Sequence, residues 1–201
     1  MQKTQKFSLS AIALGVLLAA AAPAHALEYT GASFRDASAG NAVVSYGSGL
    51  SQSFDIDFGT LSSVTLSFVT FRNEGASTMD FSALINNLTG LNFEGFTVKL
   101  TGGATFLSPY GTVTPGFGTI AGTTNSATQS STSFSSGESY ALEFGNPLSM
   151  PGQSDWTISF AGVQAGSTFG INVTAVPEPE TYAMLLAGLG LVGSLVRRRR
   201  S

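Results

Sequence analysis

The sequence predicts an all-β protein whose residues 27–175 form an antiparallel β-sandwich of jelly-roll or immunoglobulin-like type. Two observations predict this fold. Short runs that alternate between apolar and polar residues recur along the chain, and a two-residue period is that of a half-buried strand. Between these runs lie connections rich in Gly, Ser and Thr, while charged residues make up only 10% of the chain. Such spacing suits many short strands joined by tight turns.

The clearest strand covers residues 53–58, where Asp55 and Asp57 share the face opposite the apolar side chains. A second alternating run covers residues 64–68. A helical period appears only at residues 81–88, where a single helical turn is an alternative. Seven or eight strands fit one domain of about 150 residues. The remaining strands are expected at residues 79–84, 95–100, 104–107, 139–144, 156–163 and 169–176.

Residues 121–137 form an uncharged tract of Ser, Thr, Gly, Ala, Asn and Gln with a single aromatic residue. Because such a tract can bury little apolar surface, we expect a long mobile loop or a frayed edge strand. Its hydroxyl groups could bind polysaccharide, or they could simply be solvated.

The first 26 residues have the pattern of a secretory signal peptide. Lys3 and Lys6 precede an apolar segment at residues 9–22, and Ala24 and Ala26 frame an A-x-A cleavage site. A permanent N-terminal anchor is the alternative. Cleavage after Ala26 would leave a mature chain that starts at residue 27.

The region between the two terminal segments is acidic, with three basic and ten acidic residues and a net charge of about −7. This charge repels phosphate backbones and predicts no nucleic-acid partner. The chain has no cysteine, and its one histidine lies in the signal peptide. Zinc sites with Cys or His ligands and nucleophilic triads are therefore excluded, and we expect no cofactor.

The last 26 residues combine three features. An extended acidic segment opens them, because each proline fixes φ and restricts its predecessor. A charge-free run of 15 residues follows at 182–196, short for a membrane span of about 20 residues. Tyr182 and a final arginine cluster suit the two membrane interfaces, although a buried core helix is the alternative. The segment comprises Val176, Pro177, Glu178, Pro179 and Glu180, and the cluster comprises Arg197, Arg198, Arg199 and Arg200.

This order of Pro-Glu-Pro segment, apolar run and arginine cluster resembles the PEP-CTERM sorting signal of Gram-negative bacteria. The resemblance implies recognition by exosortase, a membrane-embedded processing enzyme. It also implies a transient inner-membrane anchor, removal of the hydrophobic tail, and delivery to the cell surface or extracellular matrix. The order of strand motifs is similar to that of FxDxF-type PEP-CTERM proteins, although residues 54–58 read Phe-Asp-Ile-Asp-Phe.

Two sets of residues are candidates for binding. Asp55 and Asp57 lie roughly 6 to 7 Å apart on one strand face, which suits two ligands of a calcium ion or a solvated surface. Two carboxylates on one strand do not straddle a glycosidic bond, so catalysis is the weakest alternative. Trp156, Tyr110 and Tyr140 could stack on sugars, although the alternation around Trp156 favours a core position.

These observations predict an exported protein with a structural or adhesive role in exopolysaccharide or biofilm, and not an enzyme. A carbohydrate-binding module of the same compartment is the alternative. It would require aromatic side chains outside the core. An enzyme would depend on carboxylates alone for acid–base chemistry.

Overall fold

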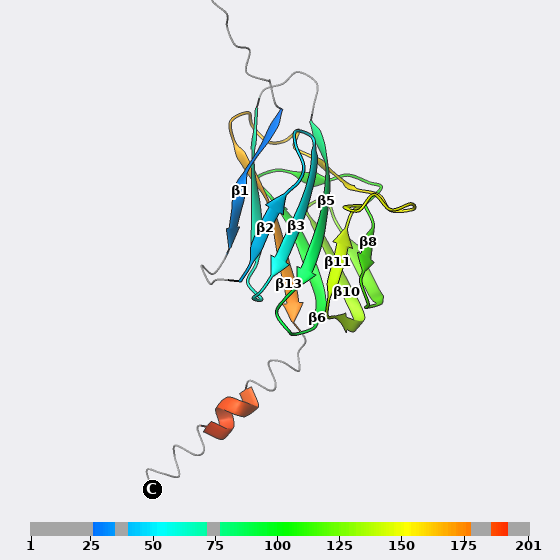
Figure 1. Cartoon of the computed structure of the whole chain (residues 1–201). Helices are drawn as coiled ribbons and strands as arrows, with labels where there is room; N and C mark the ends of the chain where they lie inside the picture. Colours follow the sequence, from blue (N-terminus) through cyan, green and yellow to red (C-terminus); the bar gives the residue numbers. More distant parts are fainter. Residues whose placement is uncertain (1–25, 35–39, 72–76, 178–185, 193–201) are drawn as a thin grey trace, which may run out of the picture.

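The computed structural model describes residues 26–34, 40–71, 77–177 and 186–192 (Figure 1). Within them the chain forms two β-sheets that pack face to face, which confirms an all-β, sandwich-like fold. The strands are β1 (Leu27–Phe34), β2 (Ala42–Ser45), β3 (Ser51–Phe58), β4 (Val64–Thr70), β5 (Thr78–Asn87), β6 (Phe93–Thr101), β7 (Thr105–Phe106), β8 (Val113–Pro115), β9 (Ile120–Asn125), β10 (Gln129–Glu138), β11 (Ala141–Phe144), β12 (Trp156–Ser159) and β13 (Thr168–Pro177).

The first sheet, sheet A, has six strands in the order β1-β4-β13-β6-β10-β9, and all neighbours are antiparallel. The second, sheet B, has the path β2-β3-β5-β11-β8, with β12 pairing to both β5 and β7. Here one prediction is wrong in detail, because β3 and β5 are parallel. The intervening strand, β4, belongs to sheet A and carries the chain back, so β5 starts from the same end as β3.

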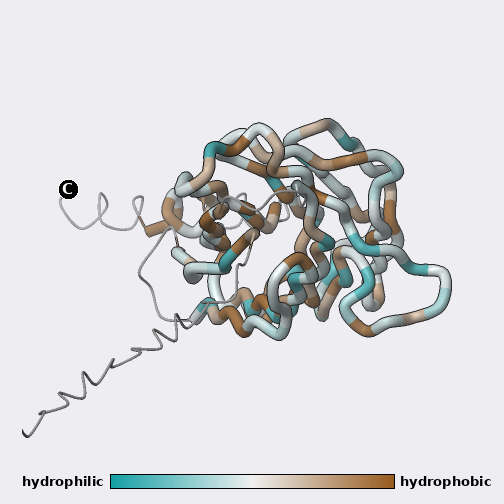
Figure 2. Tube along the Cα trace, turned by 90° about the horizontal axis from the view of Figure 1, so that it is seen from above, coloured by the Kyte–Doolittle hydropathy of each residue, from teal (hydrophilic) through white to brown (hydrophobic). Residues whose placement is uncertain are grey.

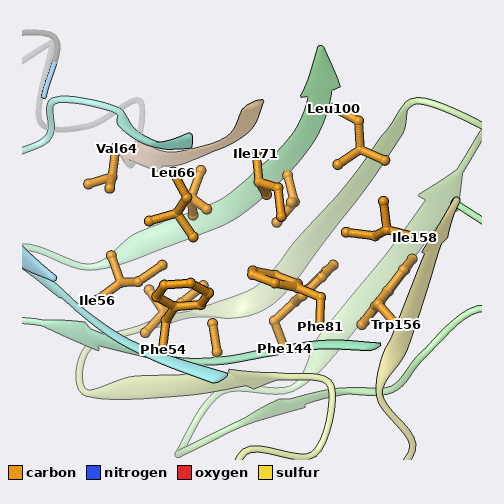
Figure 3. Close-up of a cluster of buried hydrophobic side chains, with 14 of the residues drawn as sticks. Phe54, Ile56, Val64, Leu66, Phe81, Leu100, Phe144, Trp156, Ile158 and Ile171 are labelled. Carbon is orange, nitrogen blue, oxygen red and sulfur yellow. The ribbon is translucent and has the colours of Figure 1, made fainter. Parts of the chain in front are cut away.

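The core lies between the two sheets. Figure 3 shows inward side chains of sheet A facing those of sheet B. Rings from opposite sheets meet edge to face: the centroids of Phe54 and Phe68 lie 6.1 Å apart, and those of Phe96 and Phe144 lie 5.8 Å apart. Such pairs add about 0.5–1.5 kcal/mol beyond the burial of their surface. The labelled residues are Val64, Leu66, Leu100 and Ile171 of sheet A and Phe54, Ile56, Phe81, Phe144, Trp156 and Ile158 of sheet B.

Strict alternation explains why these residues form strands. In β3 every second residue is buried, and in β4 the pattern repeats from Val64 to Thr70. Figure 2 shows hydrophobic and hydrophilic residues interspersed along the trace of the sandwich. Residues 81–87 belong to β5, so the alternative of a helical turn there is wrong. Apolar burial against sheet A selects the extended conformation.

Residues 121–137 are neither a long loop nor a single frayed strand. They form most of the β9–β10 hairpin at the edge of sheet A, with a short turn at residues 126–128. Ser130, Thr132 and Phe134 of β10 are buried, while β9 is largely exposed. Backbone pairing with β6 therefore orders a tract whose side chains offer little apolar surface.

The first strand, β1, begins at one end of the sandwich, and the last strand, β13, finishes at the other end (Figure 1). Pro177, the last residue of β13, pairs with Phe93 at the start of β6, and Glu138 at the end of β10 pairs with Phe93 from the other side. We call this the exit end. It carries the connections at residues 59–63, 88–92 and 116–119. Strand β1 starts at the other end, where Leu27 pairs with Thr70.

Candidate functional site

The Pro-Glu-Pro segment follows the last strand without an intervening linker. Val176 pairs with Gly95 and is 41% exposed, and Pro177 pairs with Phe93. Strand β13 thus crosses the predicted boundary at residue 175 and includes the first two residues of the segment. Glu178, Pro179 and Glu180 lie outside the described residues.

Of the apolar run at residues 182–196, the structure describes residues 186–192, which are helical and exposed (Figure 1). Within the described parts of the chain, no helix has the length and apolar character needed to cross a bilayer. Tyr182 and the four arginines, Arg197, Arg198, Arg199 and Arg200, lie outside those parts. The predicted membrane span therefore stays a prediction.

The predicted leader cleavage site meets the first strand. Ala24 lies outside the described residues, but Ala26 is only 7% exposed, and its carbonyl accepts a hydrogen bond of 2.9 Å from the N–H of Phe71. Leu27 is 1% exposed. In the folded sandwich the bond between Ala26 and Leu27 is thus covered, and a protease that needs an accessible extended segment cannot reach it.

Asp55 and Asp57 lie on the outer face of β3, as predicted. Each carboxylate accepts one hydrogen bond from a neighbouring strand or turn: Asp55 from the Tyr46 hydroxyl at 3.2 Å, and Asp57 from the Asn86 amide at 2.8 Å. The contact with Asp55 raises the pKa of Tyr46. No cluster of three or more possible metal-ligating residues occurs in the described part of the chain. The arrangement fits a hydrogen-bonded surface better than a calcium site, which takes six to eight oxygens.

Trp156 is a core residue. It is 1% exposed, stacks on Phe144 at a centroid distance of 4.3 Å, and donates a 3.1 Å hydrogen bond from Nε1 to the Thr112 carbonyl. Tyr110 packs against the indole at 5.7 Å and is partly buried. The Trp156 ring is covered and cannot lie flat against a sugar, so the core interpretation of Trp156 is confirmed.

Tyr140 is exposed, and the structure pairs it with Phe117, which the sequence analysis did not single out. Phe117 is 78% and Tyr140 is 64% exposed, and their centroids lie 5.5 Å apart at an interplanar angle of 63°. Because the rings are not coplanar, the pair does not form a flat platform for a sugar. It forms an apolar projection at the exit end.

Glu138 holds this projection in place. Its side chain is fully buried, and its Oε2 accepts hydrogen bonds from the N–H groups of Phe117 and Gly118 at 2.9 and 2.8 Å. Its Oε1 accepts another, at 2.9 Å, from the N–H of Tyr140. Burial alone would raise the pKa of the Glu138 carboxyl, but the backbone N–H groups, which also include that of Ala141, hold it below its ordinary value.

A groove of about 530 Å³ lies along β6, β9 and β10. Ser and Thr hydroxyl groups line it together with apolar groups, and the Thr97 and Ser131 hydroxyl oxygens lie 3.0 Å apart. Glu94 of β6 and Gly122 of β9 also line the groove. Hydroxyl and carboxylate groups of this kind can exchange hydrogen bonds with polyols or with water.

The sequence offered a weak signal for Phe117 and none for Glu138. Phe117 stands between Gly116 and Gly118 in a connection, an unusual place for a residue of that size. A β-carbon at Gly116 would lie 2.8 Å from the Ala141 carbonyl oxygen, so the close approach of the two connections requires glycine there. The role of Glu138 depends on a bend of the chain that brings residues 20 and 21 positions apart together.

Residues 175–200 match the family model of the PEP-CTERM protein-sorting motif. The chain therefore carries this motif, in agreement with the resemblance found in its sequence. The match supports an exported, surface-sorted protein that is processed by exosortase. Comparison of the chain with curated proteins and with solved structures found no match.

Proposed function

We propose that this chain is a structural or adhesive protein of the cell surface or exopolysaccharide matrix, in which the sandwich is the delivered cargo. The hydrophobic tail serves as a transient inner-membrane anchor until exosortase removes it. The PEP-CTERM motif at residues 175–200 carries this proposal. No enzymatic role is assigned, because residues 27–175 contain neither histidine nor cysteine.

The acidic, cysteine-free sandwich is consistent with such a cargo. With a net charge of about −7 between its terminal segments, it does not adhere to phosphate-rich polymers. Its stability comes from a core shared by the two sheets and needs no disulfide, so it is indifferent to the redox state of its surroundings.

Because the bond between Ala26 and Leu27 is covered in the folded sandwich, we infer an order for leader removal and folding. Leader removal precedes the pairing of β1 with β4, because the folded strand hides that bond. At the other end, the pairing of β13 with β6 protects residues 170–177. Tail removal is thus confined to the chain after Pro177 and is compatible with a folded sandwich.

Intact-mass analysis of the protein from hosts with and without exosortase tests the proposal. We expect a species that begins at Leu27 and ends after Pro177 only where the enzyme is present. Without the enzyme, the same start with a retained tail is expected. A retained tail in both hosts would contradict exosortase processing, and a mass that includes residues 1–26 would contradict leader removal.

Polysaccharide binding is a second candidate function, and the hydroxyl-lined groove is the observation that favours it. Gly122→Leu would fill the groove, since the nearest atom to a β-carbon there is the Ser133 hydroxyl oxygen at 3.7 Å. We expect this variant to lose retention on the host's isolated exopolysaccharide, while Ala127→Leu in the β9–β10 turn retains it. Equal retention of both variants would exclude the groove as the binding site.

A further inference from the structure

The exit end of the sandwich exposes a group of large apolar side chains. Phe117 is 78%, Tyr140 64%, Leu88 63% and Leu91 38% exposed. We call these four residues the exit patch.

The three connections that carry the exit patch are hydrogen-bonded to one another. The Asn87 side-chain amide donates to the carbonyls of Leu91 and Glu138, at 2.6 and 3.1 Å, and the Asn87 N–H donates to the Tyr140 carbonyl at 2.7 Å. Glu138 in turn binds the N–H of Phe117. The patch is therefore a fixed part of the fold and not a set of independent side chains.

Chain length keeps the exit patch close to the apolar tail. Only four residues, 178–181, separate Pro177 from Tyr182, where the apolar run begins. Even fully extended, the chain from residue 177 to residue 182 spans roughly 18 Å. The headgroup region of a bilayer is itself about 6 Å thick on each side. With the tail in a membrane, the exit end must lie at or near the membrane surface.

The charges at this end favour apolar rather than electrostatic contact. Its described residues, in the ranges 40–42, 57–64, 86–95, 115–119, 134–141 and 173–177, include no lysine or arginine but do include Asp57, Glu94 and the buried Glu138. Anionic headgroups would therefore gain nothing from these described residues. Phe, Tyr and Leu side chains, in contrast, are suited to the boundary between headgroups and acyl chains.

We propose that the exit patch is a membrane-docking surface, which inserts into the interface of the bilayer that holds the tail and orients the sandwich upright on it. The inference rests on the proposed function, because the tail brings the patch to the membrane. Docking presents the chain after Pro177 at the membrane surface, where a membrane-embedded processing enzyme acts. Removal of the tail leaves only the small patch as an anchor, which releases the protein.

Exposed apolar residues also occur at the opposite end, where Leu50 is 38% and Phe71 43% exposed. Hydrophobicity alone would allow either end to face a membrane. The position of the tail selects the exit end. The opposite end therefore supplies matched controls.

The test uses single cysteines, which the natural chain lacks. Ser139→Cys places an environment-sensitive fluorophore on an exposed residue beside Tyr140, and Ala127→Cys places it in the β9–β10 turn at the opposite end. The tail-bearing chain from a host without exosortase is reconstituted into phosphatidylcholine vesicles that contain doxyl-labelled lipid. We expect several-fold stronger quenching at position 139 than at position 127.

Vesicle flotation of the same samples separates the two proposals. A chain that floats but is not quenched at position 139 overturns membrane docking and leaves the transient anchor standing. A chain that does not float overturns the anchor itself. Equal quenching at both positions overturns an upright orientation. A label at position 139 that is shielded from aqueous iodide but not quenched by lipid identifies a second copy of the chain as the occupant, which also overturns docking.

Paired variants identify the side chains responsible. Phe117→Ser combined with Tyr140→Ser should reduce quenching at position 139, whereas Leu50→Ser combined with Phe71→Ser should leave it unchanged. Emission of Trp156, the only tryptophan, reports whether each variant keeps its core. Unchanged quenching in a folded Phe117/Tyr140 variant would show that the exit patch does not bind the membrane.

Discussion

At the scale of single residues, Glu138 shows how backbone N–H groups can stabilise a buried charge. The N–H groups of three residues, Phe117, Gly118 and Tyr140, donate to its two oxygens. Hydrogen bonds to a charged group are worth about 1.5–3 kcal/mol each, and they offset the cost of removing the carboxylate from water. The result is a clamp between two connections that exposes two aromatic rings.

Glu138→Gln tests this clamp. Glutamine keeps the length of the side chain but replaces one accepting oxygen by an NH₂ group, which cannot accept from the backbone. We expect a loss of about 2 kcal/mol in the free energy of unfolding at neutral pH, measured by denaturant titration. Glu94→Gln, outside the clamp, should change stability by less than about 0.5 kcal/mol.

The same carboxylate predicts a pH dependence with a definite sign. Because folding lowers the pKa of Glu138, its contribution is fully present above the unfolded pKa of about 4.3 and is lost as the pH falls through the lower, folded value. The stability of the natural chain should therefore decline in this acidic window more steeply than that of Glu138→Gln. Parallel acid profiles would show that the carboxylate is not held as described.

At the scale of elements, the β6–β10 pairing gives order to a tract that has little apolar character of its own. Ser130, Thr132 and Phe134 pack inward, while the backbone of β10 pairs with both β6 and β9. Backbone hydrogen bonds do not depend on side-chain polarity. A Ser- and Thr-rich segment can thus form a strand if the backbones of neighbouring, well-packed strands pair with it.

Gly95→Ala tests the closeness of that pairing. A β-carbon at Gly95 would lie 2.4 Å from the Thr132 carbonyl oxygen, so β10 would have to move away from β6. We expect a loss of about 2–3 kcal/mol in the free energy of unfolding. Gly122→Ala in β9, where the nearest atom is 3.7 Å away, should be neutral or slightly stabilising. Similar stabilities of the two variants, measured by thermal unfolding, would contradict the close approach.

At the scale of the whole molecule, the arrangement of the strands separates the two ends of the delivered domain. Strand β1 begins at one end of the sandwich and β13 finishes at the other. If both terminal segments lay in one membrane while the sandwich was folded, the chain at one end of the sandwich would have to run the length of the domain to reach that membrane. Under the proposed function, early removal of the leader would avoid this conflict and leave the exit end alone facing the membrane.

The sequence alone determined the fold class and the sorting motif. Apolar alternation is a local property with a period of two, so it identifies strands such as β3 and β4 without knowledge of their partners. The Pro-Glu-Pro segment, apolar run and arginine cluster are contiguous in the chain, and their recognition needs no tertiary contact. For the same reason Trp156 could be assigned to the core from its own strand.

Tertiary structure alone decided the parallel pairing of β3 with β5, the β9–β10 hairpin, the Glu138 clamp and the exit patch. Each depends on which segments become neighbours. The clamp joins residues 20 and 21 positions apart, and the patch joins connections that follow β5, β8 and β10. Such contacts arise from the packing of one sheet on the other. Local residue patterns determine which segments become strands, but the order of those strands in space decides which exposed side chains gather at one end.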